Sequence, residues 1–248
     1  MNPDLVKDAS GNWITDKNMK LVDFTYEEIS KYNVESIKPD TKYAKRFKNQ
    51  KPAKGERIPK LTDFLKHVNE DKYKDVFLNL EIKSTPIKDN LTPNPEEMVS
   101  LILKDIKEHK LEDRTLITSY DWRILYELKK QNSNILRGFI TLQQGLSTTG
   151  KNIYENSPWM VKNYPMEELF LLPNIIKSLE GHVWSAFYRD VTKQNVELAH
   201  KHGLATCVWT VNREQDIIRM IEYGVDGIIT DYPKKVQEIC KSKNISWF

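Results

Sequence analysis

An acid and a base, Glu81 and Lys83, stand at the end of an apolar run over residues 76–83. If this run is a β-strand, its side chains alternate between two faces, so Asn79, Glu81 and Lys83 share one face. Removing two such charges from water costs several kcal/mol unless a partner, a metal or an anion compensates. Two interpretations stay open, a functional site and a structural ion pair at the strand end.

The elements that would position these charges follow a repeating pattern from residue 58 onward. Apolar runs typical of strands are centred near residues 79, 117, 139, 184, 208 and 228, and amphipathic helical stretches separate them. The spacing is close to the ~30 residues of one βα unit, which favours a parallel sheet. A closed barrel needs about eight such units. We therefore predict an α/β fold, an incomplete (β/α)8 TIM barrel with about six of its eight βα units.

Two helices of this pattern have an expected buried face. The first opens at Pro59, with Leu61, Phe64, Leu65 and Val68 at helical spacing. The second begins at Pro95 and is predicted to bury Met98, Leu101, Ile102 and Ile106.

The first 57 residues do not follow the βα pattern. They are polar and are interrupted by prolines and glycines, and only a short helix after Thr25, a typical capping residue, is expected there. We predict that residues 1–57 are an irregular insertion, that residues 58–248 are the carboxyl-terminal part of the barrel, and that the two form one domain overall.

Composition excludes several classes of protein. The net charge is only +3 over 248 residues, and the basic side chains are scattered, which argues against nucleic-acid binding. No stretch approaches the ~20 apolar residues of a membrane span. The two cysteines predict separate thiols without a disulfide. The first residues lack a signal-peptide core, so a cytoplasmic location is the default expectation for this chain, and its oligomeric state is left open.

Four motifs occur together and in order. They are residues 78–83 (LNLEIK), 118–125 (TSYDWRIL), 208–212 (VWTVN) and 224–233 (GVDGIITDYP). In this combination the chain resembles the glycerophosphodiester phosphodiesterase family, which belongs to the PLC-like phosphodiesterase TIM-barrel superfamily. Members hydrolyse glycerophosphodiesters such as glycerophosphocholine to sn-glycerol 3-phosphate and an alcohol.

The resemblance implies roles for four residues. Glu81 would be one carboxylate ligand of Ca2+ or Mg2+, and Lys83 would hold the phosphate. Trp209 would form the wall of the pocket beside the glycerol. Tyr120 would line the pocket where the family usually has phenylalanine. The implied partner is a small-molecule glycerophosphodiester.

The chain departs from the family at its amino-terminal motifs. In the family, the His-Arg-Gly motif, the Glu-x-Asp metal pair and the second catalytic histidine lie upstream of the matched motifs, and this sequence does not have them there. We therefore expect an amino-terminally truncated family member with an incomplete metal site, no assignable catalytic residue and no activity of its own. The chain itself is expected in the cytoplasm by default, whereas a longer, full-length form of the protein would be periplasmic or secreted.

Two alternatives stay open beside the hypothesis of an amino-terminally truncated family member. One is a non-catalytic remnant that binds phosphate or glycerophosphate, and the other is a different hydrolase of the same superfamily. Among the five histidines, His67, His109, His200 and His202 are expected on the solvated faces of helices. Only His182, before a strand, could approach the barrel mouth.

Overall fold

The computed structural model describes residues 1–88, 91–132, 134–144 and 150–246. The chain divides into two compact units. The amino-terminal unit is Met1–Lys74 with Asn90–Thr92, and the sheet unit is Asp75–Asp89 with Pro93–Phe248. The predicted boundary after residue 57 and the expectation of one domain remain predictions.

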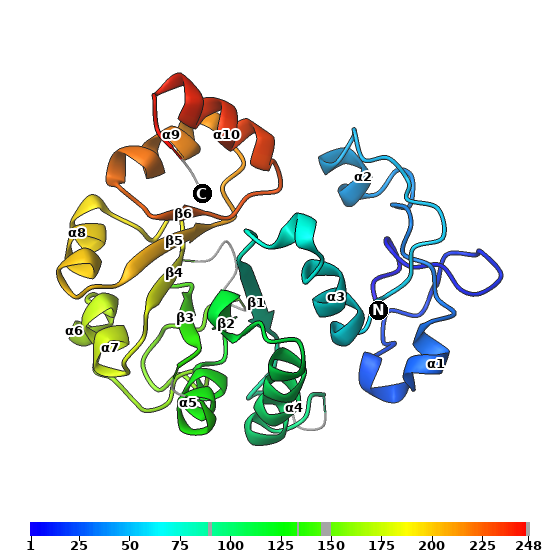
Figure 1. Cartoon of the computed structure of the whole chain (residues 1–248), viewed down its shortest axis with the longest axis horizontal. Helices are drawn as coiled ribbons and strands as arrows, with labels where there is room; N and C mark the ends of the chain where they lie inside the picture. Colours follow the sequence, from blue (N-terminus) through cyan, green and yellow to red (C-terminus); the bar gives the residue numbers. More distant parts are fainter. Residues whose placement is uncertain (89–90, 133, 145–149, 247–248) are drawn as a thin grey trace. The chain divides into compact units, whose positions relative to one another are not determined.

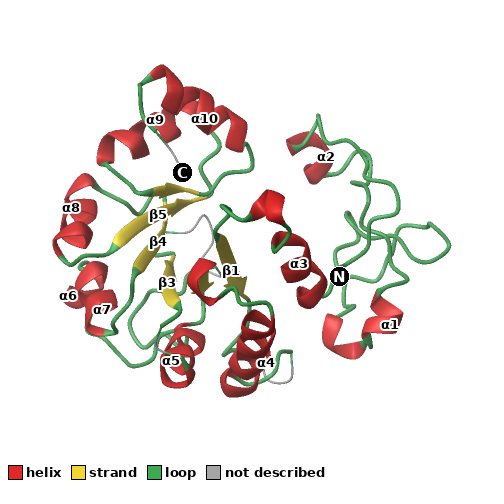
Figure 2. Cartoon of the chain, in the orientation of Figure 1, coloured by secondary structure: helices red, strands yellow, loops and turns green. Residues whose placement is uncertain are grey.

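The sheet unit contains six parallel strands whose spatial order equals their order in the chain. They are β1 (Leu78–Ile82), β2 (Thr115–Ser119), β3 (Leu136–Thr141), β4 (Val183–Phe187), β5 (Ala205–Trp209) and β6 (Gly227–Ile228). The sheet curls into a half-barrel with its helices along the outer face (Figure 1 and Figure 2). Each predicted strand position lies in one of these strands, which confirms the parallel α/β fold. That the barrel is incomplete stays a prediction.

Helices follow the strands in the expected alternation. They are α4 (Pro95–Glu108), α5 (Trp122–Gln131), α6 (Met166–Leu169), α7 (Leu172–Ser178), α8 (Lys193–Lys201), α9 (Glu214–Tyr223) and α10 (Pro233–Ser242). Side chains of Asn94, Asp121 and Thr192 accept hydrogen bonds from the first turns of α4, α5 and α8. Gly224 ends α9 in the left-handed region, at φ 80°, where glycine is favoured.

The core of the sheet unit lies between the outer face of the sheet and these helices. Trp122 of α5 packs edge-on against Phe139 of β3 with ring centroids 4.9 Å apart, and its Nε1 donates to the Ile140 carbonyl at 3.1 Å. Trp184 Nε1 donates to Thr141 Oγ1 at 2.9 Å. Both indoles thus bury their rings while their polar atoms keep partners, as buried tryptophan requires.

The predicted inner face of α4 is wrong in part. The buried residues are Val99, Leu103 and Ile106, whereas Leu101 is 53% exposed. The buried residues follow the helical spacing i, i+4 and i+7 from Val99. The prediction failed because an adjacent face of the same helix is similarly apolar.

Helices of the amino-terminal unit are short. They are α1 (Tyr26–Ile29), α2 (Lys42–Arg46) and α3 (Leu61–Val68), with 3-10 turns at Leu21–Asp23 and Asp71–Tyr73. Thr25 and Glu28 form the capping box that starts α1, which confirms the predicted helix. In α3, Leu65 and Val68 are buried as predicted, but Phe64 is 42% exposed.

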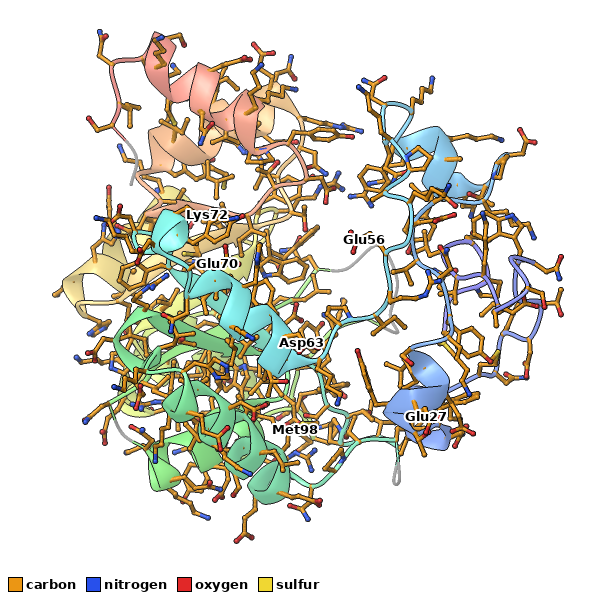
Figure 3. All side chains as sticks on the ribbon, turned by 45° about the vertical axis from the view of Figure 1, so that its right-hand side comes forward. Glu27, Glu56, Asp63, Glu70, Lys72 and Met98 are labelled. Atoms are coloured by element: carbon orange, nitrogen blue, oxygen red, sulfur yellow. The ribbon has the colours of Figure 1, made fainter. Side chains whose placement is uncertain are left out.

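The remaining backbone of this unit is irregular. Its described residues pair only through isolated antiparallel bridges, Lys7 with Trp13 and Asn33, and Asn33 with Arg57. Figure 3 shows Asp63 on α3 and Glu70 and Lys72 beyond its end. Glu70 pairs with Lys72 at 3.1 Å and with His67 at 2.8 Å, which places His67 on a solvated surface.

None of the described helices combines the length and the apolar character needed to cross a bilayer. Cys207 and Cys240 are separate thiols, as predicted. Burial, with a smaller contribution from Asp226, raises the pKa of Cys207 to about 11.

Candidate functional site

A pocket of about 560 Å³ opens at the carboxyl ends of the strands in the sheet unit. Glu81, Lys83, Tyr120 and Trp209, the four residues singled out from the sequence, all line it. The strands are in parallel register, with Glu81 opposite Thr118 and Thr118 opposite Gly138, so their carboxyl ends meet at one edge. This is the edge where barrel enzymes carry their active sites.

Glu81 and Lys83 form an ion pair at the pocket, with Lys83 Nζ 2.5 Å from Glu81 Oε1. Both project with Asn79 from the pocket face of β1, while Leu78 and Ile82 are buried on the other face, as the alternation predicted. The side chains are 39% exposed for Glu81 and 79% exposed for Lys83. The expectation that burial makes these charges costly is therefore wrong, because the strand end opens to solvent.

The floor of the pocket is polar and closely packed. Thr118 Oγ1 donates to Asn79 Oδ1 at 2.8 Å, which joins β2 to β1 below the charges. Gly138 on β3 lies against Thr118, and a Cβ at this position would be 2.6 Å from Thr118 Cγ2. Glycine at 138 thus leaves room for the side chain that holds Asn79.

Hydrogen bonds join the end of β1 to Ser119 of β2 and to Asp121, the residue that caps α5. Ser119 Oγ donates to the Ile82 carbonyl at 2.8 Å, and Ser84 Oγ donates to Asp121 Oδ2 at 2.7 Å. Asp121 is fully buried and accepts two bonds from the Arg123 guanidinium, at 2.9 and 2.7 Å. The residues on either side of Lys83 are therefore held in place even though Lys83 itself is exposed.

Trp209 forms one wall of the pocket. Its Nε1 donates to the Ser185 carbonyl at 3.0 Å, and its ring lies 5.4 Å from that of Phe187. The indole is thus oriented by β4 before any ligand enters.

Tyr120 lies across the pocket and is held by the segment that follows β3. Its hydroxyl donates to the Gly150 carbonyl, and Trp159 packs edge-on against its ring at 5.3 Å. Burial, and to a lesser degree the Asp190 carboxylate, raises the pKa of Tyr120 above its ordinary value. Tyr120 is therefore a neutral hydroxyl at physiological pH.

Asn152 joins the strand ends around Tyr120, and sequence reasoning missed it. The side chain is fully buried, and its amide nitrogen donates to the carbonyls of Tyr120 and Ile140 at 2.9 and 2.8 Å. Its oxygen accepts from the Leu142 amide at 2.9 Å. No local sequence pattern predicts the role of Asn152, because its hydrogen-bond partners lie 10 to 32 positions away in the chain.

Asp190, after β4, also holds the start of this segment and was missed. Its carboxylate accepts from the backbone amides of Gln143 and Gln144 at 2.7 and 3.0 Å. Burial raises the pKa of Asp190, and these two hydrogen bonds oppose the rise.

The pocket does not by itself fit a Ca2+ or Mg2+ ion. Among the described residues, no group of three or more histidine, cysteine, aspartate or glutamate side chains is placed to hold a metal. Glu81 is the carboxylate in the described pocket lining, and one of its oxygens contacts Lys83. A hard cation takes six or more oxygen ligands, so Glu81 could supply one ligand of a site that other groups would have to complete.

The five histidines do not line this pocket. His182 precedes β4 at its amino end, at the opposite edge of the sheet from the pocket. Its Nδ1 accepts from the Arg137 backbone amide at 3.1 Å. The other four lie on helices or just after them and contact Glu70, the Asp105 carbonyl, Asp226 and Asn174.

His182 should make folding stability depend on pH. Burial, together with the positive charges of Arg137 and Lys177, lowers the pKa of His182 below its ordinary 6.5. The unfolded chain then binds the proton more tightly, so the stability present above pH 6.5 is lost as pH falls from 6.5 through the folded-state pKa. We expect His182→Asn, which keeps an acceptor for the Arg137 amide, to lose less stability than the parent between pH 8 and pH 5. Urea unfolding at both pH values measures this, and equal losses in the two proteins would contradict it.

Comparison with known proteins supports one family. The model of the glycerophosphoryl diester phosphodiesterase family matches residues 6–235. The chain belongs to this family. Members of the family are phosphoric diester hydrolases.

A glycerophosphodiester phosphodiesterase of Caldanaerobacter subterraneus subsp. tengcongensis is 32% identical over 86% of the chain and 69% of its own length. Human lysophospholipase D GDPD1 is 25% identical over 62% of the chain, and the match spans 52% of that protein.

One solved structure agrees with the family assignment, and a second shares the fold. A crystal structure from Silicibacter pomeroyi assigned to glycerophosphoryl diester phosphodiesterases has a TM-score of 0.84 and 31% identity. The match covers 100% of this chain and 78% of the chain in the Silicibacter structure. A glycerophosphodiester phosphodiesterase from Parabacteroides distasonis, with a TM-score of 0.58 and 20% identity, shares the fold.

Proposed function

We propose that the pocket at the carboxyl ends of the strands is a glycerophosphodiester site, in which Lys83 binds the phosphate and Trp209 flanks the glycerol. The observation that supports this most is the meeting of Glu81, Lys83, Tyr120 and Trp209 in one pocket of a chain that belongs to this family. A phosphodiesterase from Oleispira antarctica, which shares the fold at a TM-score of 0.55 and 20% identity, has been solved with the product sn-glycerol-3-phosphate.

The chemistry of the pocket favours binding over cleavage. Lys83 offers an ammonium to phosphate oxygens, with three donors of which one is shared with Glu81. The hydroxyls of Thr118 and Tyr120 already donate to Asn79 Oδ1 and to the Gly150 carbonyl. Hydrolysis of a phosphodiester needs a general acid and a general base beside the scissile bond. The described lining provides no histidine, and Tyr120 with its raised pKa is a poor acid or base at neutral pH. We therefore propose that this chain by itself binds glycerophosphodiesters without turning them over.

The family expectation of a Ca2+ or Mg2+ ion is part of this proposal in a limited form. Glu81 would contribute one carboxylate oxygen, and the remaining ligands would come from groups outside the described pocket. The incomplete-barrel interpretation is consistent with this, because strands beyond the six would bring further side chains to the same edge.

Removing the ammonium tests the phosphate role. We expect Lys83→Met to weaken sn-glycerol 3-phosphate binding by at least about tenfold, because a charge-assisted hydrogen bond contributes roughly 1.5–3 kcal/mol. Isothermal titration calorimetry measures the affinity. Lys104→Met is the matched control, since Lys104 lies on α4 in an exposed pair with Glu108 at 3.8 Å. An unchanged affinity in Lys83→Met would overturn the assignment.

The absence of turnover is tested with glycerophosphocholine in the presence of Ca2+ or Mg2+. We expect no release of choline above the uncatalysed rate. Turnover that disappears in Glu81→Ala would contradict the proposal, because it would show that the site is sufficient for hydrolysis.

A further inference from the structure

We infer that Glu81 sets the charge specificity of the pocket, so that a singly charged phosphodiester binds in preference to a doubly charged phosphomonoester. The inference rests on the proposed function, in which Lys83 binds the phosphate. It assigns to Glu81 a role that requires no metal ion.

The charges that line the pocket are balanced. Lys83 is the cation and Glu81 the anion among its described lining residues, and the other side chains there are neutral. Two further carboxylates lie nearby, but both are engaged. Asp121 is buried against Arg123, and Asp190 accepts two backbone amides. The pocket therefore has no excess positive charge to hold a dianion.

The two charges of the pocket are in contact. Lys83 Nζ lies 2.5 Å from Glu81 Oε1, and an ammonium has three donors. A phosphate oxygen that accepts one of the remaining donors comes within a few ångströms of the Glu81 carboxylate. Each negative charge on the ligand then experiences both the attraction of Lys83 and the repulsion of Glu81, although solvent at this open strand end weakens both.

The two classes of ligand differ in charge. A phosphodiester carries one negative charge, whereas a phosphomonoester carries about −1.5 to −2 near pH 7 because its second pKa is about 6. Hydrolysis of a diester converts the first kind of anion into the second. In the pocket without a metal ion, Glu81 thus favours a phosphodiester over the phosphomonoester that hydrolysis of the diester would form.

The experiment compares two probes in wild type and in Glu81→Gln, in EDTA at pH 8. The probes are glycerophosphoglycerol, a diester of one negative charge, and sn-glycerol 3-phosphate, a monoester of two. We expect Glu81→Gln to tighten binding of both, by roughly fivefold for the diester and roughly 25-fold for the monoester, if each ligand charge is repelled by on the order of a factor of five. Glu108→Gln, which removes the acid of an exposed pair on α4, should change neither affinity.

Each other result has a distinct meaning. If Glu81→Gln raises the affinity for both probes by the same factor, Glu81 does not discriminate between their charges and the inference is overturned. If Glu81→Gln lowers the affinity for both probes, Glu81 acts by positioning Lys83 and the inference is overturned as well. If wild type binds neither probe, or if Lys83→Met binds both as well as wild type, the proposed function itself fails. If wild type binds the probes only when Ca2+ or Mg2+ replaces EDTA, Glu81 acts through a cation and the inference is also overturned.

Discussion

Asp121→Ala is expected to lower the free energy of unfolding by about 3 kcal/mol, since breaking a buried pair from one side leaves polar groups without partners. Asp121 is fully buried and accepts from the Arg123 guanidinium, the Arg123 backbone amide and Ser84 Oγ. Its loss also removes the amino-terminal cap of α5. Urea unfolding followed by tryptophan fluorescence measures the change.

Two variants show whether the buried carboxylate causes this effect. Asp216→Ala removes the acid of a more exposed pair with Arg219 on α9, at 2.9 Å, and should cost less than about 1 kcal/mol. Asp121→Asn keeps an oxygen for the cap but loses the charge, so its stability should lie between wild type and Asp121→Ala. A cost for Asp121→Ala no larger than that of Asp216→Ala would show that the buried network contributes little.

Asn152→Ala is expected to cost about 2–3 kcal/mol and also to weaken ligand binding. The alanine leaves the Tyr120 carbonyl and the Leu142 amide without this partner, while the Ile140 carbonyl keeps its bond from Trp122 Nε1. Each unsatisfied buried group costs roughly 1–3 kcal/mol before relaxation. Tyr120, Ile140 and Leu142 line the pocket, so its wall should loosen as well. Denaturant unfolding and titration with sn-glycerol 3-phosphate measure the two effects.

Asn132→Ala is the matched control for Asn152. The Asn132 side chain accepts an exposed bond from the Asn134 amide at 2.9 Å, so its loss should cost less than about 1 kcal/mol and leave affinity unchanged. If Asn152→Ala loses stability but binds the ligand normally, the pocket wall does not depend on this amide.

Features with a local repeat could be read from the sequence. Alternation placed Glu81 and Lys83 on one face of β1, and apolar runs located the six strands. The capping side chain of Thr25 marked the start of α1. In these cases the structure depends on residues a few positions apart, which a single sequence displays.

Features that depend on distant partners could not be read in this way. Asn152 and Asp190 hold the pocket through bonds to strand ends and loops up to 47 positions away. Gly138 matters because Thr118 lies beside it on the next strand. The exposure of Glu81 and Lys83 was also missed, because an apolar run does not show that its end opens into a pocket. The inner face of α4 was misjudged since two adjacent stripes were similarly apolar.

The order of the strands has a consequence for how the sheet unit acquires its structure. Every strand after β1 pairs with the strand that precedes it in the chain, so each new pairing closes only one crossover. The connection from Ser119 of β2 to Leu136 of β3 is among the shortest of these crossovers. The entropy lost in closing a loop grows with its length, and proteins rich in near-neighbour pairings fold faster than those that must join distant segments. We therefore expect the sheet to grow by successive addition, with β2 and β3 meeting before β1 and β6 are both in place.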